Sequence, residues 1–190
     1  MISSQFKDLI HPNVLVQRVV WIAITGSIIF YFVFVYIFVR EGRTQAFEKS
    51  EGLEAVLYAA AAITAICSIL YRRYSLSDER LTKILNREID IRTLAKSSGT
   101  GTSEHEKLAR LEALSDFEKK VLSLMCDLQK STHINLIINE TVAILGLVLA
   151  FLSGDPLKII PFGIVSLLLN IWMFPRPEAI LEKAQNLFRA

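Results

Sequence analysis

Four uninterrupted apolar blocks, set apart by charged segments, are the feature of this sequence that most limits its fold. The blocks cover residues 19–39, 55–71, 133–152 and 159–174. Because nearly all charges lie outside them, the overall hydrophobic content of 52% conceals two populations of residues. A helix of about 20 apolar residues is long enough to cross the hydrocarbon core of a bilayer. We therefore expect an all-α integral membrane protein with four transmembrane helices.

The blocks group into two transmembrane hairpins. The first block is longer than the roughly 7–15 apolar residues of a signal peptide, so we interpret it as a span. Residues 40–54 connect it to the second block, and residues 1–71 form an N-terminal segment with the first hairpin. The turn-forming run Ser153–Pro156 closes the second hairpin, which covers residues 133–174.

The distribution of Lys and Arg predicts the orientation of the spans. Seventeen of the 21 basic residues lie before the first span, between the second and third spans, or after the fourth. Basic residues accumulate on the cytoplasmic side of membrane proteins, so both termini and the middle segment are expected to be cytoplasmic, in the inner membrane of the cell. The apolar spans imply the lipid bilayer as a partner. Because acidic residues are interspersed with the basic ones, we expect no nucleic acid as a partner.

The middle segment, residues 72–132, carries apolar residues at helical spacing on both sides of a run of turn formers near Gly99–Gly101. This pattern predicts a cytoplasmic helical hairpin with arms of roughly 25 residues. Three serine–acid pairs three residues apart resemble capping boxes: Ser75 with Asp78, Ser103 with Glu106, and Ser115 with Glu118. The apolar stripes pack against each other or offer a docking surface to a partner helix. The tail, residues 175–190, is expected to form an amphipathic helix on the membrane surface or against the base of the hairpin.

Glu140 is the one ionisable residue well inside a predicted span. An acidic residue near the bilayer centre costs about 2.5–3.5 kcal/mol on insertion scales, so its presence calls for an explanation. One interpretation is a carboxyl group that carries a proton or cation across the membrane. The other is a structural carboxyl that hydrogen-bonds polar residues of the bundle, for which the candidates are Thr25, Ser27, Asn139 and Asn170.

Small residues at three- and four-residue steps predict where helices approach each other closely. In the third span they follow Asn139 and are Ala143, Gly146 and Ala150. In the second span they are Ala55, Ala59, Ala62 and Ala65. The two cysteines, Cys67 and Cys126, and the three histidines lack the spacing of metal ligands, and no catalytic arrangement is recognisable. We therefore expect no metal, no cofactor and no enzymatic activity.

The run Asn139–Leu152 resembles the carboxylate-bearing helix of the proteolipid c subunits of rotary ATPases, in which a Glu is followed by small and aliphatic residues. Residues 134–177 also resemble small bacterial four-span membrane proteins of a c-subunit-like kind. The resemblance implies that Glu140 carries an ion. Two functions are therefore open: a non-catalytic accessory subunit of a larger membrane complex, docked through its cytoplasmic hairpin or self-associated, and a c-subunit-like protein that translocates protons or cations.

Overall fold

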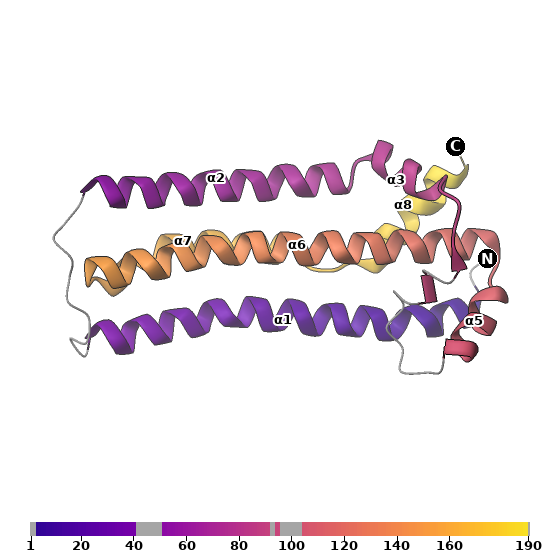
Figure 1. The fold of residues 1–190 in the computed structure, drawn as a ribbon, viewed down its shortest axis with the longest axis horizontal. Coiled ribbons are helices and arrows are strands. Elements are labelled where there is room, and N and C mark those ends of the chain that lie inside the picture. The colour runs from indigo at the N-terminus through magenta and orange to yellow at the C-terminus, as the bar shows by residue number, and fades with distance from the viewer. Residues whose placement is uncertain (1–2, 41–50, 92–93, 96–103, 190) are drawn as a thin grey trace. The chain divides into compact units, whose positions relative to one another are not determined.

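The computed structural model describes residues 3–40, 51–91, 94–95 and 104–189, and every regular element in these ranges is helical (Figure 1). The prediction of an all-α protein is thereby confirmed. The helices are α1 (Ser4–Arg40), α2 (Glu51–Ser75), α3 (Asp78–Leu85), α5 (Glu104–Glu112), α6 (Asp116–Ser153), the short 3₁₀ helix η1 (Pro156–Lys158), α7 (Ile159–Trp172) and α8 (Pro177–Arg189).

Three helices are long and apolar enough to cross a membrane, which indicates a membrane protein. These candidate spans are Phe6–Val39, Gly52–Ser75 and Asp116–Ser153. A fourth is counted only if α7 and α8 are taken together across the break between them. The 14 residues of α7 extend about 21 Å, which is less than the roughly 30 Å of a hydrocarbon core.

The chain divides into two compact units. Unit 1 consists of Met1–Val19, Arg73–Ser131 and Pro175–Ala190, and unit 2 consists of Val20–Arg72 and Thr132–Phe174. Unit 1 therefore collects the two ends of the chain and the middle segment, whereas unit 2 contains most of the apolar helices.

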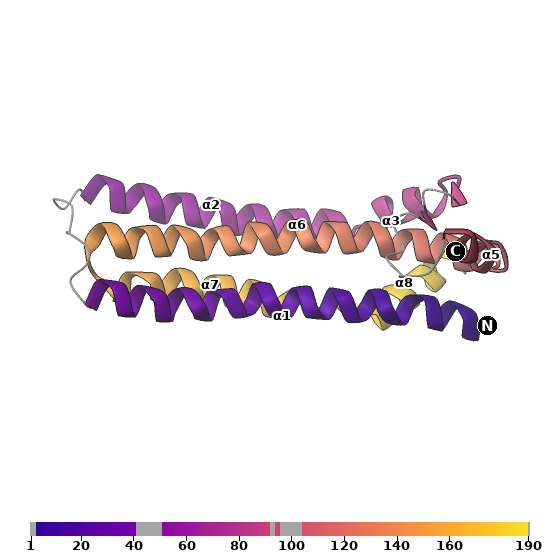
Figure 2. The ribbon, with the colours of Figure 1, turned by 60° about the horizontal axis from the view of Figure 1, so that its bottom comes forward.

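In unit 2, α1 and α2 run on either side of α6 (Figures 1 and 2). Two clusters of buried apolar side chains hold these helices and α7 together. One cluster joins α1 to α6 and α7 and consists of Val35, Val39, Ala150 and Ile159. The other joins α2 to α6 and α7 and consists of Ala61, Val142, Leu149 and Phe162. Large apolar side chains on the outer faces of α1 and α2 stay exposed, as in Phe30 and Ile63. Such faces suit contact with lipid.

The small residues of α6 lie at the helix contacts. Ala143 and Ala150 are fully buried, and Gly146 lies so close to α7 that an added Cβ would be 2.5 Å from the Cβ of Phe162. Of the small residues predicted for α2, Ala65 packs against the inner cluster, whereas Ala55, Ala59 and Ala62 are exposed. The face of α2 that packs inward also carries Ala61. Because residues 59–62 are all alanine, spacing alone did not distinguish the inward face.

Unit 1 has one apolar core to which α1, α3, α5, α6 and α8 all contribute. Its buried side chains include Phe6, Leu9, Leu81, Leu85, Leu111, Val121, Leu122 and Ala184. The apolar stripe of the middle segment is thus buried within the protein's own core, together with both ends of the chain. The predicted outgoing arm of about 25 residues is wrong, because α3 ends at Leu85 after eight residues. Ile89 keeps a four-residue spacing from Leu85, so the apolar spacing did not reveal that the helix ends there. The predicted tip, Gly99–Gly101, lies outside the described residues.

Two of the three predicted capping boxes can be assessed. At the start of α6, the Ser115 hydroxyl accepts a hydrogen bond from the Glu118 N–H (3.3 Å), and Glu118 Oε2 accepts one from the Ser115 N–H (3.0 Å). This reciprocal pair confirms the prediction. The prediction for Ser75 is wrong: α2 continues through Ser75, and Ser77 caps α3 by accepting from the Arg80 N–H. Ser77 takes this role because it directly precedes the first residue of α3. Ser103 lies outside the described residues.

Glu118 also ties the N-terminal end of the chain to α6. Its Oε1 accepts a hydrogen bond from the Ser3 N–H at 2.7 Å, and only 5% of the residue is exposed. Burial alone raises the pKa of this carboxyl, but the hydrogen bonds from Ser3 and Ser115 outweigh burial and lower the pKa from 4.5 to about 2. A pKa that is lower in the folded state stabilises the fold above pH 4.5, and this contribution is lost as the pH falls towards 2.

We therefore expect Glu118→Gln to lower the free energy of unfolding at neutral pH by about 2–3 kcal/mol, and to flatten its decline in acid. Thermal unfolding in detergent, followed from neutral pH to about pH 3, measures both effects. The exposed Glu112 offers the matched control Glu112→Gln, which should behave as the native chain does. An equally steep acid decline in the Glu118→Gln and native chains would contradict the assignment.

Candidate functional site: polar side chains between apolar helices

Glu140 of α6 is hydrogen-bonded to two hydroxyl groups of α1. Its Oε1 accepts from Ser27 Oγ at 2.7 Å and from Tyr31 OH at 2.6 Å. Ser27 and Tyr31 are four residues apart and therefore share one face of α1. Of the partners considered from sequence, the structure brings Ser27 to Glu140. Tyr31 was missed, although its four-residue spacing from Ser27 was a usable signal.

The hydrogen count at Glu140 allows two protonation states. Ser27 Oγ lies 2.7 Å from the carbonyl oxygen of Ile24 as well as 2.7 Å from Glu140 Oε1. If Glu140 is ionised, both hydroxyls donate to it. If Glu140 is protonated, it donates to Ser27, and Ser27 donates to Ile24. The site can therefore hold or release a proton without leaving its hydroxyl groups unpaired.

Asn139, the neighbour of Glu140, connects α6 to α2 and α7. It is fully buried, and its Oδ1 accepts a hydrogen bond from the Ser68 hydroxyl of α2. Its Nδ2 donates to Asn170 Oδ1 of α7 at 2.9 Å, and its backbone carbonyl accepts from Ser166 Oγ at 2.6 Å. Because successive helical residues point about 100° apart, Asn139 and Glu140 reach different neighbouring helices.

The Asn139 cluster extends along the bundle by one helical turn. Ser68 Oγ also lies 2.8 Å from Asn135 Oδ1, but a hydroxyl has one hydrogen and serves one amide oxygen at a time. The indole N–H of Trp21 donates to the carbonyl oxygen of Asn170 at 2.7 Å. Among the described residues, the fully buried Asn170 has no hydrogen-bond partner for its Nδ2. Asn170 therefore depends on Asn139 for its one side-chain hydrogen bond.

Comparisons with protein-family models, with curated proteins and with solved structures found no match to this chain. The resemblance of residues 139–152 to c subunits therefore stays a prediction. Within the described ranges, no three His, Cys, Asp or Glu side chains are placed to hold a metal ion together, and neither Cys67 nor Cys126 forms a disulfide bond.

Proposed function

We propose that this chain is a four-span membrane protein that holds a small helical unit at the cytoplasmic face of the inner membrane, as a non-catalytic accessory subunit of a larger complex. The observation that carries the proposal is the composition of the unit 1 core. Phe6 from the N-terminal segment, Leu122 from the middle segment and Ala184 from the tail are buried in one cluster. Long apolar stretches separate these three segments in sequence.

Segments that share a core lie on the same side of a membrane. Each stretch that connects them must then cross the bilayer an even number of times. The first stretch contains α1 and α2, which supply two crossings. In the second stretch α6 supplies one crossing, so the return is assigned to α7, despite its length. Asp155 supports the reversal, because its side chain accepts from the Leu157 N–H and caps η1 (2.9 Å).

An ion pair supports the same topology. Lys158, in η1, pairs with Glu54, near the start of α2. The connection between α6 and α7 therefore lies beside the end of the first hairpin, as two hairpins of the same orientation require. The excess of basic residues in unit 1 supports a cytoplasmic location for that unit.

In this account the polar residues of unit 2 are structural. Glu140 joins α6 to α1 through two hydroxyl groups, and Asn139 joins α6 to α2 and α7. Hydrogen bonds between helices stabilise bundles in lipid, where no water competes for the same groups. Because unit 1 buries the apolar stripe of its middle segment, we assign the contact with a partner subunit to its exposed polar surface.

Cysteine labelling tests the topology. In a background with Cys67 and Cys126 replaced by serine, single cysteines are introduced at the exposed positions Lys83, Glu182 and Leu157. We expect a membrane-impermeant maleimide to label Leu157→Cys in intact spheroplasts, and Lys83→Cys and Glu182→Cys only after the membrane is permeabilised. Labelling of all three positions from the same side would contradict a fourth span.

A second candidate function is the translocation of protons or cations by Glu140. One observation favours it: the hydroxyl groups of Ser27 and Tyr31 can satisfy both the ionised and the protonated carboxyl. A carboxyl that changes its protonation state without breaking its contacts is suited to carrying a proton. The two candidates differ in the ion flux that they predict.

A further inference from the structure

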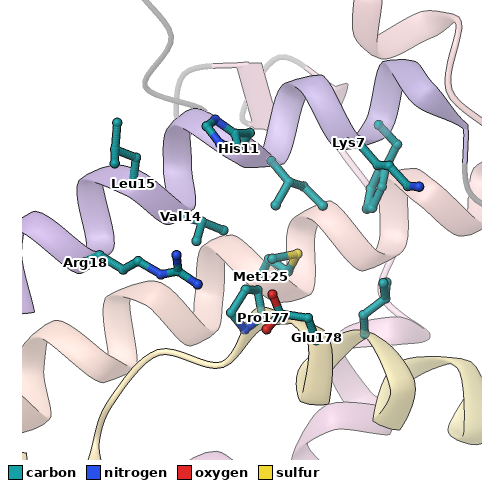
Figure 3. Close-up of a pocket in the computed structure, with 11 residues that line it drawn as sticks. Lys7, His11, Val14, Leu15, Arg18, Met125, Pro177 and Glu178 are labelled. Atoms are coloured by element: carbon teal, nitrogen blue, oxygen red, sulfur yellow. The ribbon is translucent and has the colours of Figure 1, made fainter.

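Unit 1 contains a groove of about 370 Å³ between α1, α6 and α8 (Figure 3). Its floor is apolar and includes Phe6, Ile10, Val14, Met125 and Leu181. Pro177 and Glu178, at the start of α8, form part of the wall opposite α1. A groove with this lining suits a ligand that has an apolar body and a polar head.

The wall formed by α1 is basic. Lys7, His11 and Arg18 line the groove, and all three are exposed. At about 100° per residue, positions four and eleven residues after Lys7 lie within about 40° of it around the helix. Their positions therefore fall within a narrow sector of α1, and Figure 3 shows all three residues on the α1 side of the groove. Glu178 is the one acidic residue among those that line the groove. The net charge of the lining favours an anionic ligand.

The groove is continuous with an exposed apolar surface of α1. Leu15, which lines the groove, and Val19, directly after Arg18, are each 57% exposed. Val19 is also the first residue of the first apolar block. A lipid headgroup near Arg18 would therefore lie beside apolar side chains that its acyl chain can contact. This continuity favours a lipid over a soluble peptide as the occupant.

We propose that this groove binds an anionic phospholipid, with its anionic headgroup along the basic wall of Lys7, His11 and Arg18 and an acyl chain on the apolar floor. Arginine and lysine side chains are the usual protein partners of phosphate groups. Basic pockets at the cytoplasmic ends of membrane helices are suited to such headgroups. The inference rests on the membrane location in the proposed function, and it goes beyond that function by naming a ligand.

Lipid retention by the full chain in a neutral detergent tests the proposal. Native mass spectrometry counts bound phosphatidylglycerol and bound phosphatidylcholine of identical acyl chains. We expect phosphatidylglycerol to bind at least about tenfold more tightly, since each basic residue contributes appreciably to the attraction of anionic lipid. The variant Lys7→Gln/His11→Gln/Arg18→Gln should lose this preference.

A matched control removes basic residues of unit 1 that do not line the groove. Arg73→Gln/Lys83→Gln/Arg87→Gln changes three exposed residues and should stay within about twofold of the native chain. Glu178→Gln removes the acidic residue of the groove and leaves its basic residues in place, so this variant should bind phosphatidylglycerol more tightly than the native chain does. The proposal would be overturned if the triple groove variant and the triple control variant lost equal affinity for phosphatidylglycerol. It would also be overturned if neither the triple groove variant nor Glu178→Gln changed that affinity.

Two soluble competitors separate a lipid from a free phosphate compound. Inorganic phosphate and glycerol 3-phosphate should not displace phosphatidylglycerol, because neither fills the apolar floor. Displacement at concentrations similar to that of the lipid would show that the groove binds phosphate alone, and the lipid assignment would fall. The measurement is made in detergent and does not depend on the number of spans, so its failure is distinguishable from failure of the topology.

Discussion

Replacing Gly146 by alanine should lower the free energy of unfolding by about 2–3 kcal/mol, the range expected when a packed contact is overfilled. The added methyl group would lie 2.5 Å from the Cβ of Phe162, which is fixed to the backbone of α7. No rotation of the Phe162 side chain relieves this contact, so α6 and α7 must move apart. Phe162 is 3% exposed and packs with Val142 and Leu149, so the separation disturbs a whole cluster.

Two other glycines provide the controls for Gly146→Ala. A methyl group at Gly26 of α1 would have nothing within 4 Å, so Gly26→Ala should leave stability unchanged or raise it slightly. At Gly163 of α7 the methyl group would meet the far end of the Phe32 ring, which can swing aside, so the loss should be smaller than at Gly146. Unfolding by sodium dodecyl sulfate in mixed micelles ranks the three variants. Equal losses at Gly26 and Gly146 would contradict the packing of α6 on α7.

Replacing Asn139 by leucine should also cost about 2–3 kcal/mol, because buried polar groups are left without partners. Asn170 is fully buried, and Asn139 is the donor to its Oδ1. In the variant, both the oxygen and the nitrogen of the Asn170 amide would be unpaired within the described structure. Ser68 would keep Asn135 as an acceptor, so the lost stability comes mainly from the contact between α6 and α7.

Thr141→Val is the matched control for Asn139→Leu. Thr141 is two residues further along α6, is exposed, and donates to the carbonyl oxygen of Ile137 within its own helix. Its replacement should change stability by less than about 0.5 kcal/mol. The same micelle titration measures both variants. If Asn139→Leu unfolds at the same detergent fraction as Thr141→Val, the Asn139 cluster does not hold the bundle together.

The features set by local sequence were predictable. The apolar blocks gave the helical class and the candidate spans, and the spacing of Ser115 and Glu118 gave the start of α6. Where neighbouring residues were equally suited to one structural role, the sequence did not show which of them takes it. Ser75 and Ser77 could each cap α3, and any residue of the alanine run 59–62 could face inward.

The contacts between distant segments could not be predicted in the same way. Ser3 lies 115 residues from Glu118, and no pattern in either segment specifies their hydrogen bond. The core of unit 1 likewise joins Phe6 to Ala184, which have separate and individually unremarkable apolar stripes. Helical periodicity shows that a face is buried but does not name the segment that covers it. For that reason the sequence left open whether the stripes of the middle segment pack against each other or dock a partner helix.

Proton flux into proteoliposomes tests most directly the central claim that Glu140 joins helices and carries no ion. The native chain and Glu140→Gln, whose amide oxygen can still accept from Ser27 and Tyr31, are reconstituted at equal density, and an imposed potential drives the flux. The account predicts that both chains give the flux of empty vesicles. A native flux above that of empty vesicles, abolished by Glu140→Gln, would contradict the account and establish Glu140 as the ion carrier.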